Sequence, residues 1–525
     1  MRSIPGGGNE KSENHKQITS TTKTITIMTK LTTLATIHKL AERYPFNDEE
    51  LEILVRCHEH LEDNENKEDF LMKLAVTSPY SYFFLPGDEM RDRVNFIEDK
   101  VLPAGFASDF RAAISADAFV EYANQGTDKK LERFLEGIAD TGRRGNKEAL
   151  STLYNIVGGS DPSDAQLIDC AVRLAVASDV LVAPLFNKQA ILKQVQELEP
   201  IIQSLTDSLQ DTHRLKPLTK KDFISWAEDD FPLLSTPLST FVHNLLFHGH
   251  PYPEGRIPLA IPKLDHMSDI FKSPNSPFLT ALAFMAPTVG GKWRRLYTSE
   301  MDGRSFNRLE WSLLGYAGPT LLVIKATDDS TLGAFTAVPW KEARGFYGNT
   351  DCFIFELEPK IGVHRPMGTE DHFMYLHSHY SDTGLLQQCR GRPHGIGFGG
   401  SLEQPRLFIP ESLEGCHAHF LDKTFESGEL LPLESLEKFE IKYLEIWGVG
   451  GDDVVTRALR ERAEYRERTD TTILKARTVE DKSIFVVDMK SGLIPNKLFA
   501  EAEQARGRHD FVVDDEHGGY KVDRK

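Results

Sequence analysis

The stretch from residue 303 to residue 357 constrains the fold more than any other part of the chain, because one helix-patterned segment and three strand-patterned segments follow one another within it. Apolar residues recur at spacings of three and four, at Phe306, Leu309 and Leu313. This spacing places them on one face of a short amphipathic helix. We expect Ser305 to cap the start of this helix and Gly315 to end it in the left-handed conformation.

Three apolar runs follow this helix, at residues 321–324, 334–338 and 352–357. Gly318-Pro319 and a polar turn at 327–331 separate them, and short apolar runs between turn signals predict strands. In the last run, Phe and Leu side chains alternate with Cys, Ile and Glu side chains, so that the two groups lie on opposite faces. The stretch therefore predicts a buried sheet core and not a catalytic motif.

These residues also carry a family resemblance. The order G-x-S-F-N-R-L, Y-x-G-P-T-L-L-V-I-K, G-A-F, W and Y-G-N-x-x-C-F-I-F resembles the TLDc domain. That family includes the oxidation-resistance proteins and the lysosome-associated, mTOR-associated TLDc proteins. The resemblance continues through G-I-G-F-G-G at 395–400 and ends at Y-L-E-I-W-G, so it covers roughly residues 238–450. It implies two packed antiparallel sheets with a few helices at their ends.

The composition is that of a soluble globular protein, with 40% hydrophobic and 27% charged residues. A length of 525 residues gives room for about two to four domains. The formal net charge of −18 argues against a general nucleic-acid binder, which would need a basic face to displace counterions.

Five cysteines without a Cys-x-x-Cys pair predict a reducing compartment and give no zinc-ribbon spacing. No apolar run approaches the roughly twenty residues that a transmembrane helix requires, and the first residues lack the apolar segment of a secretory signal. We therefore expect a cytoplasmic protein, with any membrane association only peripheral.

Four regions are predicted along the chain. Residues 1–30 are rich in Gly, Ser, Thr and Lys, which predicts a disordered segment. Residues 31–235 have helical periodicity, including one continuous helix at 187–210. Residues 236–451 are the predicted TLDc domain, in which short strands alternate with Gly and Pro turns from residue 265 to residue 450. Residues 452–525 predict a charged helix and a loose polar tail. The fold class is α+β: an all-helical EF-hand-like region, then an antiparallel two-sheet β-sandwich of the TLDc type with flanking helices.

An acidic loop between two predicted helices near the start of the helical region resembles an EF-hand. Counting from Asp63, Lys67 occupies the fifth ligand position and Leu74 the twelfth, where a bidentate Glu belongs. A lysine among the ligands of a hard cation adds charge repulsion in place of an oxygen. We expect an EF-hand-like helical pair that binds no calcium.

The glycine-rich run at 395–400 invites comparison with a phosphate-binding loop. It lacks the G-K-[ST] ending, and no amphipathic helix follows to direct its N-terminus at a phosphate. Glycines in this position are better explained by bulges or by close approach of backbones in packed sheets. We predict no cofactor.

Histidine pairs at His377/His379 and His417/His419 each place two imidazoles on one strand face. Two such pairs could form a zinc or iron site if their strands met. The alternative, surface or hydrogen-bonded strand histidines, is favoured because no carboxylate stands at a supporting spacing. We predict no metal ligand.

Two cysteines, Cys389 and Cys416, have histidines within a few residues. A redox role would require a thiolate in a basic and exposed setting, which sequence proximity alone does not provide. Cys352, in the Phe-rich run, is expected to be a small inert hydrophobe.

Glu445 is the candidate buried carboxylate. Alternation along the strand at 439–447 places it on one face with Phe439, Ile441, Tyr443 and Trp447. If that face is the core, the carboxylate must have a partner. A structural hydrogen bond to backbone amides is favoured over an acid with a raised pKa, because no second acid is visibly paired with it.

A charged helix is predicted from residue 454 to about 468, after the flexible G-V-G-G at 448–451. Its narrow apolar stripe and its position make it the candidate partner contact, through Arg457, Arg460, Glu461 and Arg462. No catalytic residue is predicted.

The TLDc resemblance implies a non-enzymatic regulatory protein that binds the peripheral sector of the vacuolar-type proton ATPase. It further implies a peripheral place on a lysosomal or vacuolar membrane and a link to lysosomal signalling or the oxidative-stress response. Two alternatives stay open from the residues: a redox- or metal-dependent antioxidant enzyme, and a calcium-responsive adaptor.

Overall fold

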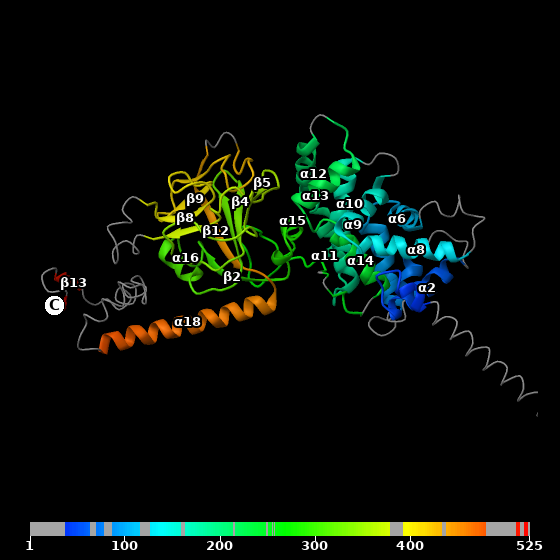
Figure 1. Cartoon of the computed structure of the whole chain (residues 1–525), viewed down its shortest axis with the longest axis horizontal. Helices are drawn as coiled ribbons and strands as arrows, with labels where there is room; N and C mark the ends of the chain where they lie inside the picture. Colours follow the sequence, from blue (N-terminus) through cyan, green and yellow to red (C-terminus); the bar gives the residue numbers. More distant parts are fainter. Residues whose placement is uncertain are drawn as a thin grey trace, which may run out of the picture. The chain divides into compact units, whose positions relative to one another are not determined.

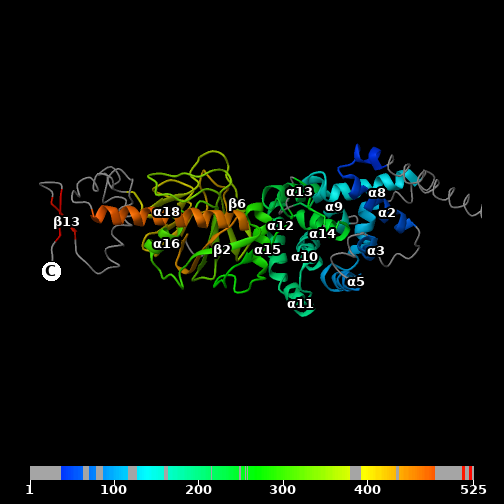
Figure 2. The same ribbon diagram turned by 90° about the horizontal axis from the view of Figure 1, so that it is seen from below.

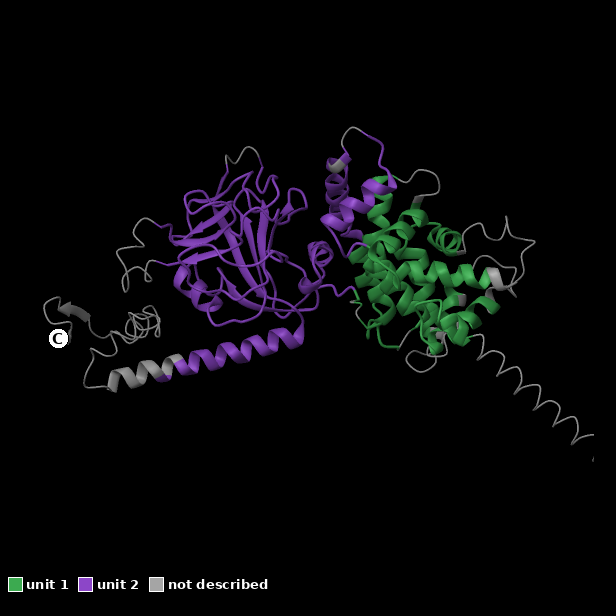
Figure 3. Cartoon of the chain, viewed as in Figure 1, with its two compact units in different colours: residues 1–195, 235–258 green, residues 196–234, 259–525 purple. Residues whose placement is uncertain are grey.

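The computed structural model describes thirteen stretches of the chain, which are residues 37–62, 70–77, 87–115, 127–158, 163–213, 216–247, 250–254, 256, 258–378, 392–432, 437–478, 511–514 and 519–522. The chain forms two compact units (Figure 3). Unit 1 comprises Met1–Val195 and Ser235–Pro258, and unit 2 comprises Gln196–Leu234 and Leu259–Lys525. At residue 235 the chain thus passes from unit 2 to unit 1. The division of the chain into four regions, made from the sequence, stays a prediction.

Unit 1 is helical in the part of the chain that the structure describes (Figure 1). Its helices are α2 (Asp48–Glu62), α3 (Phe70–Thr77), α5 (Gly87–Phe96), the π-helical turn η2 (Ile97–Val101), α6 (Phe106–Ser115), α8 (Thr127–Gly142), α9 (Asn146–Gly158), α10 (Asp164–Val182), α11 (Lys188–Gln196) and α14 (Thr236–Leu246). Residues 63–69, which hold most of the rejected calcium loop, lie outside the described residues.

The central helix of unit 1 is α10, which is buried along most of its length and packs against α14. Ser163 and Gln166 form a capping box at its start. At its other end, the fully buried Arg93 donates hydrogen bonds to the carbonyl oxygens of Val180 at 2.8 Å and Ala183 at 2.7 Å. These carbonyls have no partner within the helix, so Arg93 both satisfies them and compensates the negative end of the helix dipole.

The prediction of one continuous helix at 187–210 is wrong, because two helices occupy this region. They are α11 and α12 (Glu199–His213). Pro200 lies in the first turn of α12, where its missing N–H leaves no hydrogen bond unmade. In the interior of one long helix, the same proline would remove a backbone hydrogen bond.

Unit 2 contains two packed sheets. The seven-stranded sheet has the order β1 (Lys263–Leu264), β2 (Lys292–Thr298), β12 (Ile441–Gly448), β3 (Thr320–Ala326), β4 (Thr331–Thr336), β5 (Phe353–Glu358) and β6 (Gly362–His364). The five-stranded sheet has the order β11 (Lys438–Phe439), β10 (Cys416–Ala418), β9 (Leu407–Pro410), β8 (Gly395–Phe398) and β7 (Tyr375–His377). Only β1 and β2 pair in parallel among these strands. The predicted α+β class, helices followed by an antiparallel two-sheet structure, is confirmed.

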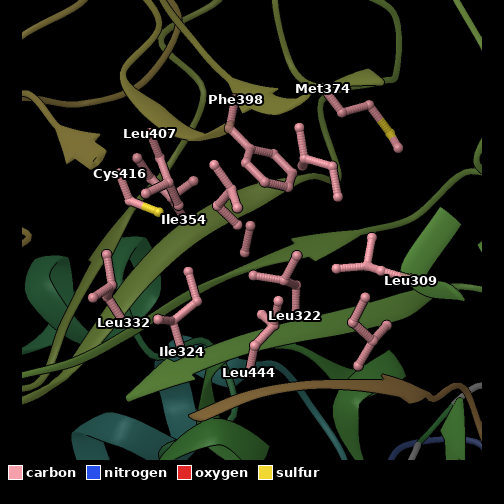
Figure 4. Packing of buried hydrophobic residues seen from close by; sticks show 14 of the residues in the cluster. Leu309, Leu322, Ile324, Leu332, Ile354, Met374, Phe398, Leu407, Cys416 and Leu444 are labelled. Atoms are coloured by element: carbon pink, nitrogen blue, oxygen red, sulfur yellow. The ribbon is translucent and has the colours of Figure 1, made fainter. Parts of the chain in front are cut away.

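The core of unit 2 lies between the two sheets (Figure 4). Leu322, Ile324 and Leu444 come from the seven-stranded sheet, and Phe398 and Leu407 come from the five-stranded sheet. Every residue of β3 except Lys325 is buried, as the apolar run predicted for a strand covered on both faces. A short hairpin of β13 (Phe511–Asp514) and β14 (Gly519–Val522) also forms in the tail, where the prediction of a loose segment is wrong.

The helix predicted at the start of the strand-rich stretch is α16 (Phe306–Leu313). Gly315 has a φ of +80°, so the left-handed end is confirmed. Ser305 does occupy the N-cap position, but its side chain makes no capping hydrogen bond, and in this respect the prediction is wrong.

Arg365 joins two helices of unit 2 to the sheets. Its guanidinium donates to the carbonyl oxygens of Asp230 at 2.8 Å and Met285 at 2.6 Å. These oxygens stand at the carboxyl ends of α13 (Lys220–Asp229) and α15 (Pro277–Met285). The same guanidinium lies 4.8 Å from the centroid of the Phe353 ring on β5. One side chain therefore satisfies unpaired carbonyls of two helices and stacks on the sheet.

The helical hairpin of α12 and α13 has further contacts with this end of the sheets. Ser204 of α12 accepts a hydrogen bond from the backbone N–H of Ile361 at 2.7 Å, and Lys360 forms an ion pair with Asp211. Phe223 and Trp226 of α13 are both buried. Helical patterning in the sequence therefore does not tell which helices pack with the sandwich.

Replacing Asp230 by Asn should change how the stability of unit 2 depends on pH. Burial, with Glu426 as a second cause, raises the pKa of Asp230 to about 7, while Arg365 opposes the shift. A raised folded-state pKa stabilises the protein at low pH, and this contribution is lost as pH rises from about 4 through 7. Asp230→Asn should nearly match the wild type at pH 4 and exceed its free energy of unfolding by about 4 kcal/mol at pH 8.

Denaturation followed by tryptophan fluorescence measures this effect, because all five tryptophans lie in unit 2. The exposed Glu228 of the same helix provides the matched control, Glu228→Gln, which should leave the pH dependence unchanged. Parallel pH curves for Asp230→Asn and the wild type would contradict the assignment.

Candidate functional site

The helix that carries the predicted partner contacts is α18 (Asp452–Thr478), which follows directly on β12. It runs beside β2 and α16, as Figures 1 and 2 show. Asp452 and Asp453 occupy its first turn, at the positive end of the helix dipole. Asp452 also accepts a hydrogen bond from Lys292 of β2 at 2.8 Å. Its start is therefore fixed to the edge of the sandwich.

One face of α18 packs on its own domain. Val455 and Ala458 are buried at 6% and 2% exposure, and Ala458 belongs to the buried hydrophobic cluster of unit 2. Further along, the ring of Tyr465 lies over Gly315, so close that a Cβ on this glycine would stand 2.7 Å from a ring carbon. Gly315 is thus required both by its positive φ and by the approach of α18.

Two arginines of α18 bind the carboxyl end of α16. Arg462 donates to the carbonyl oxygen of Ser312 at 2.9 Å, and Arg466 donates to that of Trp311 at 2.9 Å. The guanidinium of Arg466 also lies 4.7 Å from the centroid of the Trp311 ring. Burial, and next the positive charge of Arg466, lower the pKa of Arg462 to about 10. Both side chains therefore act as caps for a neighbouring helix.

The four predicted partner-contact residues fall on different sides of α18. Arg457, Arg460 and Glu461 are exposed, whereas Arg462 is partly buried and engaged by α16. The inward face follows a spacing of three and four that includes Arg462, and a prediction from apolar residues alone leaves this arginine out. A search for this spacing that counts aromatic and arginine side chains as packing residues would have identified Arg462 as part of the inward face.

Glu445 on β12 is buried at 1% exposure, and both oxygens of its carboxylate accept hydrogen bonds. One carboxylate oxygen accepts from the hydroxyl of Ser268 at 2.7 Å and the indole N–H of Trp447 at 3.0 Å. The other accepts from the backbone N–H of Asp269 at 2.7 Å and of Ile270 at 3.4 Å. Burial raises the pKa of Glu445, and the four donors pull it down. The carboxylate anchors the loop before α15 to the sheet.

The face that carries Glu445 does not include all of the residues predicted for it. A register shift between Ile441 and Tyr443 interrupts the alternation along β12. As a result Ile441 joins Leu444 in the core between the sheets, while Glu445 and Trp447 are absent from that core. A β-bulge of this kind inserts one residue and reverses every later side chain, so strict alternation fails across it.

The structure does not bring the histidine pairs together. In the five-stranded sheet, β8 and β9 separate β7, which carries His377, from β10, which carries His417. Three strand spacings correspond to about 14 Å, which is too far for one metal ion to bridge. His419 instead contacts Glu437 at 2.6 Å, and His379 lies outside the described residues. Across the described parts of the chain, no group of three or more His, Cys, Asp or Glu side chains could hold a metal ion.

The cysteines in the described stretches are Cys57, Cys170, Cys352 and Cys416, and all four are buried. Burial raises the pKa of Cys352, and it raises that of Cys416 to about 12. A buried thiol with a raised pKa is a poor nucleophile. Cys389, the other cysteine weighed for a redox role, lies outside the described residues.

The glycine-rich run forms β8 and the turn after it. Gly400 has a φ of +69°, and its N–H donates to the carboxylate of Asp422 at 2.9 Å. A side chain of the same chain therefore takes the place that an anion would occupy in a phosphate loop. Asp422 and its buried partner Arg406, 3.5 Å away, had no signal in the sequence.

Comparison with known proteins identifies the class of the sandwich. Residues 274–450 match the family of the TLDc domain, and the chain therefore contains a TLDc domain. Among curated relatives, mTOR-associated protein MEAK7 of Xenopus laevis is 30% identical over 212 residues, or 37% of this chain and 43% of that protein. The Homo sapiens protein of the same name is 29% identical over 161 residues, or 30% and 32%.

Oxidation resistance protein 1 of Bos taurus is 29% identical over 160 residues, which make up 30% of this chain and 16% of that protein. The chain thus spans less than half the length of each of these relatives. Among the described helices, none has both the length and the apolar character needed to cross a membrane.

Replacing Glu445 by Ala should destabilise unit 2 by about 3 kcal/mol, because the substitution leaves buried donors of Ser268, Asp269 and Trp447 without an acceptor. Denaturation followed by tryptophan fluorescence gives the measurement. Glu300→Ala, at an exposed position of unit 2, is the control and should change stability by less than about 0.5 kcal/mol. A loss for Glu445→Ala no larger than that of the control would show that the carboxylate does not anchor the loop.

Proposed function

We propose that this protein is a non-enzymatic regulatory protein that acts by binding partners through its TLDc domain. The match of residues 274–450 to that domain carries the proposal. The relatives add support, since their names describe one as mTOR-associated and the other as an oxidation-resistance protein. A role in lysosomal or vacuolar signalling, or in the response to oxidative stress, follows as part of the same proposal.

The partner that the TLDc resemblance implies is the peripheral sector of the vacuolar-type proton ATPase. In this proposal the protein works in the cytoplasm and reaches a lysosomal or vacuolar membrane through that complex. A protein partner suits the described residues, because buried charged side chains such as Glu445 and Arg462 serve internal contacts.

The contact surface in this proposal is the outward face of α18, with Arg457, Arg460 and Glu461. Three features support it. The side chains are exposed, the helix is already held against the sandwich by its other face, and two of the three are arginine. A helix fixed before binding loses less entropy on association, and arginine is enriched among residues that dominate binding energy.

Reversing the two charges, in the double variant Arg457→Glu/Arg460→Glu, should reduce capture of the ATPase about tenfold or more. The measurement is affinity capture of the full chain from cells, with the ATPase subunits quantified by mass spectrometry. The matched control, Arg91→Glu/Lys147→Glu, makes the same change of charge at exposed positions of unit 1 and should capture as the wild type does.

Two outcomes would contradict the proposal at different levels. Capture by the α18 variant equal to the wild type would remove the helix as the contact surface. Absence of ATPase subunits from the wild-type capture would remove the partner itself.

A further inference from the structure

Two neighbouring large apolar side chains lie exposed on one loop of unit 2. Phe420 is 47% exposed and Leu421 is 67% exposed, between β10 and β11. Met367, 44% exposed, lies in the segment between β6 and β7. Single exposed apolar residues are common on soluble proteins, but large ones gathered together mark a surface that another molecule covers.

Buried charges hold this loop from inside. Arg406 and Asp422 are exposed by 0% and 2%, and they form an ion pair at 3.5 Å. Arg406 donates to carbonyl oxygens on both sides of the apolar pair, at His419 and, at 2.7 Å, at Gly428. The carboxylate of Asp422 accepts the N–H of Thr424 at 2.8 Å. The backbone that carries Phe420 and Leu421 is therefore fixed before any partner binds, which lowers the entropic cost of binding.

Backbone hydrogen bonds join the two segments that display the three apolar side chains. The N–H of Met367 donates to the carbonyl oxygen of Thr424 at 2.8 Å, and Pro366 and Phe425 form an isolated bridge. The N–H of Gly428 closes the loop onto the carbonyl oxygen of Phe420 at 3.0 Å. Met367 and the apolar pair thus belong to one double loop.

The charges beside this double loop are mainly acidic. Glu437 accepts the backbone N–H of Phe420 at 3.3 Å and keeps 49% of its side chain exposed. Glu370 lies 3.7 Å from Lys423, and Asp371 next to it is exposed. Three carboxylates therefore stand beside Lys423, the exposed Lys438 and the imidazole of His419. Such a rim complements a basic surface and is repelled by an anionic membrane.

We propose that Phe420 and Leu421, with Met367 beside them, insert into an apolar pocket of a partner protein, and that lysine or arginine side chains line the rim of that pocket. This surface uses no residue of α18. It is therefore a second docking site of the same TLDc domain, independent of the proposed ATPase contact through that helix.

The test begins with a photo-crosslinking phenylalanine analogue at position 420 of the full chain in cells. Mass spectrometry of the crosslinked product identifies the partner segment, and a purified fragment of that partner is then titrated with the wild type. We expect the crosslinked segment to be apolar with flanking basic residues. Phe420→Ser/Leu421→Ser should weaken binding about tenfold or more, and Glu370→Lys/Asp371→Lys should also weaken it.

The matched control is Met267→Ser/Met301→Ser, which removes two apolar side chains of unit 2 that are 66% and 71% exposed. It should bind as the wild type does. The proposal is overturned if the crosslinked partner binds Phe420→Ser/Leu421→Ser as tightly as the wild type, or if position 420 crosslinks to no protein. Co-sedimentation with phosphatidylserine vesicles that is lost in Phe420→Ser/Leu421→Ser would also overturn it, by assigning the apolar pair to a membrane.

Discussion

The contact between a guanidinium group and the carboxyl end of a helix recurs at several places where this chain joins one element to another. Arg93 binds the end of α10, Arg365 binds the ends of α13 and α15, and Arg462 and Arg466 bind the end of α16. The last carbonyls of a helix have no partner within it and carry its negative pole. Arginine suits this place because it presents several donors in one plane and is always charged.

These contacts explain why helices pack where they do in unit 2. A buried guanidinium without acceptors would be very costly, and the helix ends without donors would leave carbonyls unpaired. Each partner therefore requires the other. These contacts also fix which side of α18 faces outward. Arg462 and Arg466 face α16, and Tyr465 lies over Gly315. The exposed Arg457 and Arg460 must therefore face away from the sandwich.

The local part of this fold could be predicted from the sequence, because its signals lie within a few residues. The strands from β3 to β5 and the helix α16 follow from apolar spacing and turn residues. The break before α12 could also have been predicted, since Pro200 marks it. The face on which Glu445 lies could not be predicted, because nothing in the sequence of β12 marks a bulge between Ile441 and Tyr443.

Contacts between distant segments could not be predicted in this way. Arg365 lies 135 residues from Asp230, and Arg462 lies 150 residues from Ser312. Periodicity describes which face of an element is apolar and says nothing about which other element covers it. The loop that displays Phe420 and Leu421 depends in the same way on Arg406, whose partners come from a separate turn.

Arg462 and Arg466 hold α18 on the sandwich and so set which face it presents. Amide hydrogen exchange of the full chain tests this most directly. We expect the amides at 452–466 to exchange at least about tenfold more slowly in the wild type than in Arg462→Gln/Arg466→Gln, and the exchange of β3 and β12 to be the same in both proteins. Equally fast exchange of α18 in both proteins would contradict the account.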